Sequence, residues 1–220
     1  HLCDRRQRQM CIRDRSQLGY HALAEEIFKL FLDDFTAEEI HDCVEKAYAP
    51  EKFGGETPVK VVPLSGENNS RWLLELWHGP TCAFKDMALQ ILPHFLTASQ
   101  KKRNDGREAV ILVATSGDTG KAALEGFKDV PGTSVLVFYP DGGVSQVQRK
   151  QMATQSGKNV TVCAVKGNFD DTQTGVKQIF NDAEMRTFLE ERNCFFSSAN
   201  SINWGRLLPQ IVYYFYSYFE

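Results

Sequence analysis

The feature that most constrains the fold is an alternation of short apolar strands and amphipathic helices in the second half of the chain. Residues 109–114 form a continuous apolar run, typical of a strand covered on both faces. Further strands are predicted at 134–139, 160–165 and 194–197, and a helix pattern separates each strand from the next. Strands that alternate with helices in this way form a parallel sheet with right-handed crossovers. The sequence therefore predicts an α/β fold.

The chain before these strands is mainly helical in pattern. One helix is predicted from Tyr20, and a second begins at a capping box of Thr36 and Glu39 and ends at Pro50. Residues 1–16 carry five arginines and no apolar period. For this segment an unstructured or foreign stretch is favoured over a basic arm that binds nucleic acid.

Two strands, at 59–64 and 71–77, are predicted between the helical part and the parallel sheet, with a polar turn joining them. The predicted domain organisation has three parts. Residues 1–16 are a disordered or foreign segment, residues 17–50 are a helical segment, and residues 51–220 are an α/β region. This region is expected to be truncated at its C-terminus, because the apolar pattern of the last helix is still running at the final residue.

Composition excludes several classes of partner. The 25 basic and 28 acidic residues give a net charge of −3, so no sequence-wide attraction to nucleic acid or to an anionic membrane is expected. No apolar run approaches the roughly 18 residues that span a membrane. The six cysteines show no C-x-x-C pair and no metal-ligand spacing, so we expect reduced thiols, no metal site and a cytoplasmic protein. The oligomeric state stays open.

The segment 76–90, Leu-Trp-His-Gly-Pro-Thr-Cys-Ala-Phe-Lys-Asp-Met-Ala-Leu-Gln, carries the first candidate site. A strand is expected to end before Gly79 and Pro80, and a helix to restart and run to about Lys102, with Pro93 as a place where it can kink. Lys85 lies in the first turn, about 100° from Phe84 and so at the edge of the buried stripe. Partial burial favours the free amine of a lysine, which can condense with a carbonyl. The alternative is a lysine that extends into solvent.

The second candidate site is the turn Ser116-Gly117-Asp118-Thr119-Gly120, directly after the strand at 109–114. Ligands of parallel sheets gather at the carboxyl ends of strands. Glycine lets the backbone approach a ligand, and the N–H groups of the following helix attract anions. A nucleotide phosphate loop is excluded, because the G-x-x-x-x-G-K-[ST] spacing is absent. The alternative is an ordinary turn in which Asp118 or Thr119 caps the helix.

The third candidate site is the segment 197–206, Ser-Ser-Ala-Asn-Ser-Ile-Asn-Trp-Gly-Arg, between a strand and a helix. Its hydroxyls, amides and one guanidinium are suitable donors to a phosphate. In the alternative reading, Asn203 caps the helix and Arg206 is a solvated first-turn residue. The glycine-containing segment 167–171 is interpreted as helix capping by Asp170 or Asp171, because two consecutive carboxylates would repel a phosphate.

In this order, the three segments resemble those of threonine synthases, pyridoxal-phosphate (PLP) enzymes of the tryptophan-synthase-β fold type. The resemblance covers residues 18–220, roughly the first half of such an enzyme, and residues 1–16 do not match the family's opening segment. It implies that Lys85 carries PLP as a Schiff base. The residues implied to contact the cofactor ring hydroxyl and the substrate carboxylate are Ser116, Gly117, Asp118 and Thr119. Those implied to hold the substrate phosphate are Asn200, Ser201, Asn203 and Arg206.

The resemblance also implies a reaction, the conversion of O-phospho-L-homoserine and water to L-threonine and phosphate. Lys85 would then shuttle protons at the α and β carbons of the substrate. A phosphohomoserine lyase of the same fold, which eliminates phosphate without adding water, is one alternative. The other is an inactive fragment or an interaction module. The glycine-rich loop that grips the cofactor phosphate is expected beyond Glu220, so we expect the 220-residue chain alone to be inactive.

Overall fold

A parallel sheet forms the second half of the molecule. The computed structural model describes residues 17–64, 71–104 and 106–220. Its four-stranded sheet has the order β5-β4-β3-β6, and all of its paired strands are parallel. The strands are β3 (Glu108–Ala114), β4 (Thr133–Pro140), β5 (Val160–Val165) and β6 (Cys194–Ser198). The α/β fold predicted from the alternating pattern is confirmed.

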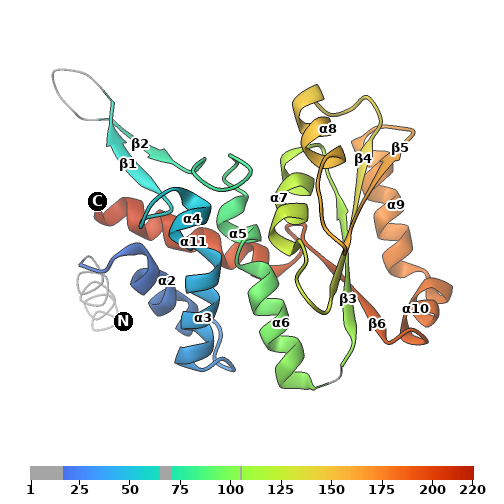
Figure 1. Cartoon of the computed structure of the whole chain (residues 1–220), viewed down its shortest axis with the longest axis horizontal. Coiled ribbons are helices and arrows are strands. Elements are labelled where there is room, and N and C mark those ends of the chain that lie inside the picture. The colour runs from blue at the N-terminus through green and yellow to red at the C-terminus, as the bar shows by residue number, and fades with distance from the viewer. Residues whose placement is uncertain (1–16, 65–70, 105) are drawn as a thin grey trace, which may run out of the picture.

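Helices cover both faces of the sheet, which explains the continuous apolar run in β3 (Figure 1). Ile111 and Val113 pack with α7 (Asp118–Phe127) on one face. Leu112 and Ala114 face the other side, where α9 (Phe169–Asn181) covers the sheet. Successive residues of a strand point to opposite faces, so a strand buried on both sides needs apolar residues at every position.

Among the described residues, five further helices lie between Asp86 and Phe219, and the last of them is the long C-terminal helix. They are α5 (Asp86–Leu89), α6 (Leu92–Arg103), α8 (Gln146–Ala153), α10 (Ala183–Glu190) and α11 (Trp204–Phe219). In Figure 1, α7 and α8 lie on one side of the sheet and α9 and α10 on the other. No helix of the described residues is both long enough and apolar enough to cross a membrane.

The helical N-terminal part packs on the rest of the chain through a shared core. It contains α2 (Tyr20–Lys29), α3 (Ala37–Ala47) and the short α4 (Pro50–Phe53). The predicted capping box is present, because Thr36 and Glu39 each accept the other's backbone N–H. A single buried cluster joins α2 and α3 to Met87, Ile91 and the α11 residue Val212. The predicted division at residue 50 stays a prediction.

A short antiparallel hairpin stands apart from the parallel sheet. β1 (Lys60–Pro63) pairs with β2 (Trp72–Glu75), close to the two strands predicted at 59–64 and 71–77. The polar turn predicted between them, and the unstructured or foreign segment predicted at 1–16, lie outside the described residues.

Two helix predictions need correction. The helix expected from residue 84 to about 102 is two helices, α5 and α6, with Gln90 and Ile91 between them. Pro93 lacks the N–H that a continuous helix would direct to the carbonyl of Leu89, so the ladder is interrupted. The N-cap of α9 is Asn168 rather than Asp170 or Asp171, and its side chain accepts from the backbone N–H of Asp171. The carboxylate of Asp171 still takes part in capping, because it accepts from the N–H of Asn168 and completes a capping box.

Candidate active site

Lys85 lies where α5 meets α7, at the carboxyl edge of the sheet. It is the N-cap residue of α5, one position before the first helical turn. The side chain is 19% exposed, so most of it is withdrawn from water. Its Nζ lies 3.3 Å from Oδ2 of Asp118 and 4.4 Å from the ring centroid of Phe84. The structure therefore brings together the lysine and the acidic residue of the first two predicted segments.

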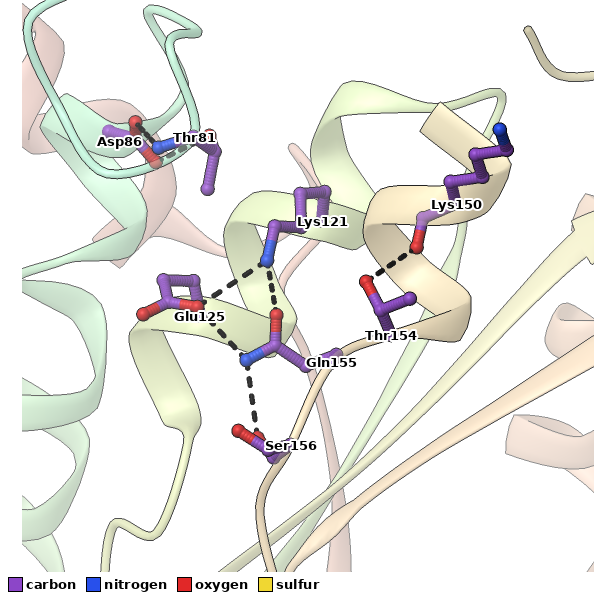
Figure 2. Close-up of polar contacts among 8 residues, drawn as sticks. All are labelled: Thr81, Asp86, Lys121, Glu125, Lys150, Thr154, Gln155 and Ser156. Carbon is purple, nitrogen blue, oxygen red and sulfur yellow. Dashed lines mark hydrogen bonds and ion pairs between the residues drawn. The ribbon is translucent and has the colours of Figure 1, made fainter. Parts of the chain in front are cut away.

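A buried carboxylate fixes the backbone around Lys85. Asp86 is fully buried and accepts hydrogen bonds from the backbone N–H and the hydroxyl of Thr81, both at 2.8 Å (Figure 2). Burial raises the pKa of Asp86, while the hydrogen bonds from Thr81 oppose that rise. A side chain at Gly79 would place its Cβ 2.6 Å from the same carboxylate. The Gly-Pro break predicted from the sequence thus leads into a turn held by Asp86.

Thr115 shapes the turn that follows β3. Its Oγ1 accepts hydrogen bonds from the backbone N–H groups of Gly117 and Gly120, each at 2.9 Å. Gly117 has a φ of +148°, which L residues rarely adopt. Neither Asp118 nor Thr119 is the N-cap of α7; that position is Gly117, which has no side chain to cap the helix. Sequence reasoning missed Thr115; the signal was a hydroxyl residue placed directly between a buried strand and a glycine-containing turn.

Asp118 is held from two sides. Lys85 contacts its Oδ2, and Nε2 of Gln148 donates to its Oδ1 at 2.6 Å. Partial desolvation would raise the pKa of Asp118, but the hydrogen bonds from Gln148 and Lys85 outweigh it and lower the pKa. The carboxylate is therefore ionised at neutral pH. In the same turn Ser116 is exposed and Thr119 is half-buried. Gln148 also belongs to the capping box at the start of α8, so its side chain both caps that helix and binds Asp118.

The third predicted segment lies at the same edge of the sheet. β6 runs parallel to β3, so their carboxyl ends are neighbours. The side-chain amide of Asn200 bonds both backbone groups of Ala114, accepting from its N–H at 3.3 Å and donating to its carbonyl at 3.0 Å. This pair ties the loop after β6 to the strand that leads into the Gly117 turn.

The polar side chains of this segment mostly bond to its own backbone. Asn203 is the N-cap of α11 and accepts from the N–H of Gly205 at 2.9 Å, as the capping alternative expected. Arg206 is only 5% exposed and donates to the carbonyl of Ala199, so the alternative reading of a solvated guanidinium is wrong. Burial lowers its pKa. Ser201 is exposed.

One cluster of potential metal ligands occurs among the described residues, away from this edge. Glu25, His41 and Glu45 present ligand atoms within 4.8 Å of one another on α2 and α3. A hydrogen bond of 2.8 Å joins the imidazole of His41 to the carboxylate of Glu25, and the histidine is mostly exposed. These contacts describe an ion pair between two helices.

The fold is that of PLP-dependent threonine synthases of known structure. The structure of PLP-bound threonine synthase from Brucella melitensis superposes with a TM-score of 0.81 at 37% identity, covering 94% of this chain and 42% of that chain. Yeast threonine synthase also gives a TM-score of 0.81, at 34% identity. No family model matches the chain.

The sequence comparisons agree with this fold. The chain is 42% identical to threonine synthase of Pseudomonas aeruginosa over 91% of its own length, and 38% identical to that of Saccharomyces cerevisiae over 94%. It is also 40% identical to human threonine synthase-like 1 over 85%. It spans 40% and 41% of the two synthases and 25% of the human protein. The chain is a homologue of threonine synthases that matches part of their length.

Proposed function

We propose that this chain supplies the lysine-bearing part of a threonine synthase active site. The reaction is the conversion of O-phospho-L-homoserine and water to L-threonine and phosphate, with PLP as cofactor. The observation that carries this proposal is the half-buried amine of Lys85, 3.3 Å from the carboxylate of Asp118 at the carboxyl edge of a parallel sheet. This edge is where ligands of such sheets bind.

The residues present fit the cofactor. PLP is an aldehyde that a lysine amine can hold covalently, and Lys85 offers an amine in a partly water-excluded position. Ser116, Gly117, Asp118 and Thr119 would line the cofactor ring, because the glycine turn lets the backbone approach closely. PLP would supply an electron sink for charge that develops on the substrate carbons.

Lys85 would then act as acid and base. Its amine would remove one proton from the α carbon and one from the β carbon of the substrate, and phosphate would leave from the γ carbon. Protons would then be returned at the γ and α carbons, while water adds its hydroxyl at the β carbon. Asp118 directs the amine through the contact at Oδ2. The rigid turn behind Lys85, held by Asp86 and Thr81, keeps the amine in one place during these transfers.

The segment after β6 would bind the substrate phosphate. Asn200, Asn203 and Arg206 support this role by fixing the loop, since their side chains bond to its backbone or to Ala114. Ser201 is exposed on the same loop, so its hydroxyl is free to donate to a phosphate oxygen. Donors on this loop would bind the dianion and stabilise it as the leaving group.

We place the reaction in threonine biosynthesis in the cytoplasm. The names of the homologues support the pathway step. The described cysteines, Cys43, Cys82, Cys163 and Cys194, are all free thiols, which suits a reducing compartment.

The test is product analysis with the protein encoded by the complete gene. Incubation with PLP and O-phospho-L-homoserine should release phosphate and form threonine in equal amounts. Lys85→Ala should abolish both products, whereas Lys150→Ala, at an exposed lysine of α8, should leave them unchanged. Phosphate with a keto acid instead of threonine would support the lyase. A folded, PLP-loaded protein that releases no phosphate would contradict both.

A further inference from the structure

Gln148 uses both ends of its side-chain amide. In the capping box at the start of α8, its Oε1 accepts from the N–H of Ser145 at 3.2 Å. The hydroxyl of Ser145 in turn accepts from the N–H of Gln148, also at 3.2 Å. The other end, Nε2, donates to Oδ1 of Asp118 at 2.6 Å. A helix cap needs the first contact alone, so the second calls for a separate explanation.

The turn after β3 is shaped to receive this amide. A Cβ on Gly117 would lie 2.3 Å from both the amide carbon and Nε2 of Gln148. Gly117 is buried, so no other residue type would leave this space open. The glycine and the glutamine are therefore complementary across the α7–α8 contact.

The far end of α8 is fixed to α7 by a second network, shown in Figure 2. The side-chain oxygen of Gln155 accepts from the amine of Lys121, and its Nε2 donates to Glu125 at 2.9 Å. Met152, 1% exposed, packs between these two ends in the core that includes α7. Because α8 is attached at both ends, it cannot slide along α7 without breaking one of the networks, and Gln148 stays in register with Asp118.

We propose that Gln148 is a positioning residue that holds the carboxylate of Asp118 against the amine of Lys85. The amide occupies Oδ1, so the carboxylate cannot rotate freely and Oδ2 remains directed at Nζ. The same hydrogen bond stabilises the charged carboxylate in a partly desolvated place, as the lowered pKa of Asp118 indicates. This inference rests on the proposed function, in which Lys85 is the reactive amine.

The first readout needs no cofactor. The carboxyl of Asp118 is titrated by carbon-13 NMR in the wild type, in Gln148→Leu and in Gln148→Glu. Glutamate keeps the capping acceptor for Ser145 but replaces the donor to Asp118 with a negative charge, so α8 stays capped. We expect a midpoint raised by about one pH unit in Gln148→Leu, and by more in Gln148→Glu.

Gln146→Glu is the matched control. It adds the same charge in the first turn of α8 at an exposed position, and it should leave the Asp118 midpoint unchanged. Circular dichroism spectra should show that all three variants are folded. An Asp118 midpoint that is unchanged in both Gln148 variants would overturn the proposal.

The second readout is the amount of PLP attached to Lys85 after borohydride reduction, measured by peptide mass spectrometry. We expect a loss of about tenfold in Gln148→Glu at limiting PLP and no loss in Gln146→Glu. Equal loading in the wild type and Gln148→Glu would overturn the positioning role. If the wild type takes up no PLP at Lys85, the proposed function fails, while the NMR titration still decides whether Gln148 acts on Asp118.

Discussion

The contact between α5 and α7 offers the sharpest test of how the fold positions Lys85. Gly126, near the end of α7, lies against α5. A Cβ added at this position would be 2.0 Å from the carbonyl oxygen of Leu89 and 2.9 Å from its carbonyl carbon. The neighbour is backbone rather than a flexible side chain, so Gly126→Ala forces the two helices apart.

Two opposing effects set the magnitude of this change. Alanine in place of glycine favours a helix by up to about 1 kcal/mol. A carbon and a carbonyl oxygen approach no closer than roughly 3.3 Å, so the helices must separate by about 1 Å. Overpacking of this kind costs about 1–3 kcal/mol and more where backbone must move. We therefore expect Gly126→Ala to lower the free energy of unfolding by about 2 kcal/mol.

Urea denaturation followed by circular dichroism measures this free energy. Gly175→Ala is the matched control, because Gly175 lies within α9 and a Cβ there would meet nothing within 4 Å. That variant should gain about 0.5–1 kcal/mol. The displacement should also reach Lys85, whose carbonyl accepts from the N–H of Leu89, and so reduce PLP uptake. A Gly126→Ala protein at least as stable as the wild type would refute the close packing.

Three further changes test the account. Burial, with the charges of Lys52 and Lys46, lowers the pKa of His94 from 6.5 to about 4. Between these two pH values the unfolded chain binds a proton at His94 and the folded protein does not, so the free energy of unfolding falls as the pH drops from 6.5 toward 4. Between pH 7 and 4.5, the free energy of unfolding of His94→Gln should therefore fall by about 2 kcal/mol less than that of the wild type, as measured by urea denaturation. An equal fall in the two proteins would contradict this. Thr115→Val leaves two N–H donors of the Gly117 turn without their acceptor and should lower the free energy of unfolding by about 2 kcal/mol in the same assay. An unchanged urea midpoint would show that Thr115 does not stabilise this turn. Asn200→Ala breaks both bonds to Ala114 and should cost about 1–3 kcal/mol; hydrogen exchange should show faster opening at the end of β3, and unchanged exchange there would count against the tie.

The sheet could be predicted because burial of a strand on both faces leaves a pattern in the local sequence. β3 is buried on both faces, so every position from 109 to 114 is apolar. The start of α3 could also be predicted, because the two residues of its capping box, Thr36 and Glu39, are close in sequence. The break between α5 and α6 was not predicted, because the apolar spacing continues through Gln90 and Ile91. Pro93 leaves the carbonyl of Leu89 without its helical partner, and the carbonyl of Met87 accepts from the hydroxyl of Tyr48, a contact between residues 39 positions apart that the local sequence does not reveal.

The candidate site could be predicted as three segments but not as a network. Lys85 and Asp118 are 33 positions apart, and Asp118 and Gln148 are 30 apart, so their contacts depend on how α5, α7 and α8 pack. The burial of Arg206 could not be predicted for a similar reason. A first-turn arginine is normally solvated, but the carbonyl of Ala199 lies within its reach and the surrounding side chains cover it.

The central claim is that the amine of Lys85 is the attachment point for PLP. The most direct measurement is borohydride reduction of the protein with PLP, followed by digestion and mass spectrometry of every lysine peptide. We predict the added mass of reduced PLP on the peptide that contains Lys85, and its loss in Lys85→Arg while the protein stays folded. Labelling of Lys121 or of exposed lysines with Lys85 unmodified would contradict the claim.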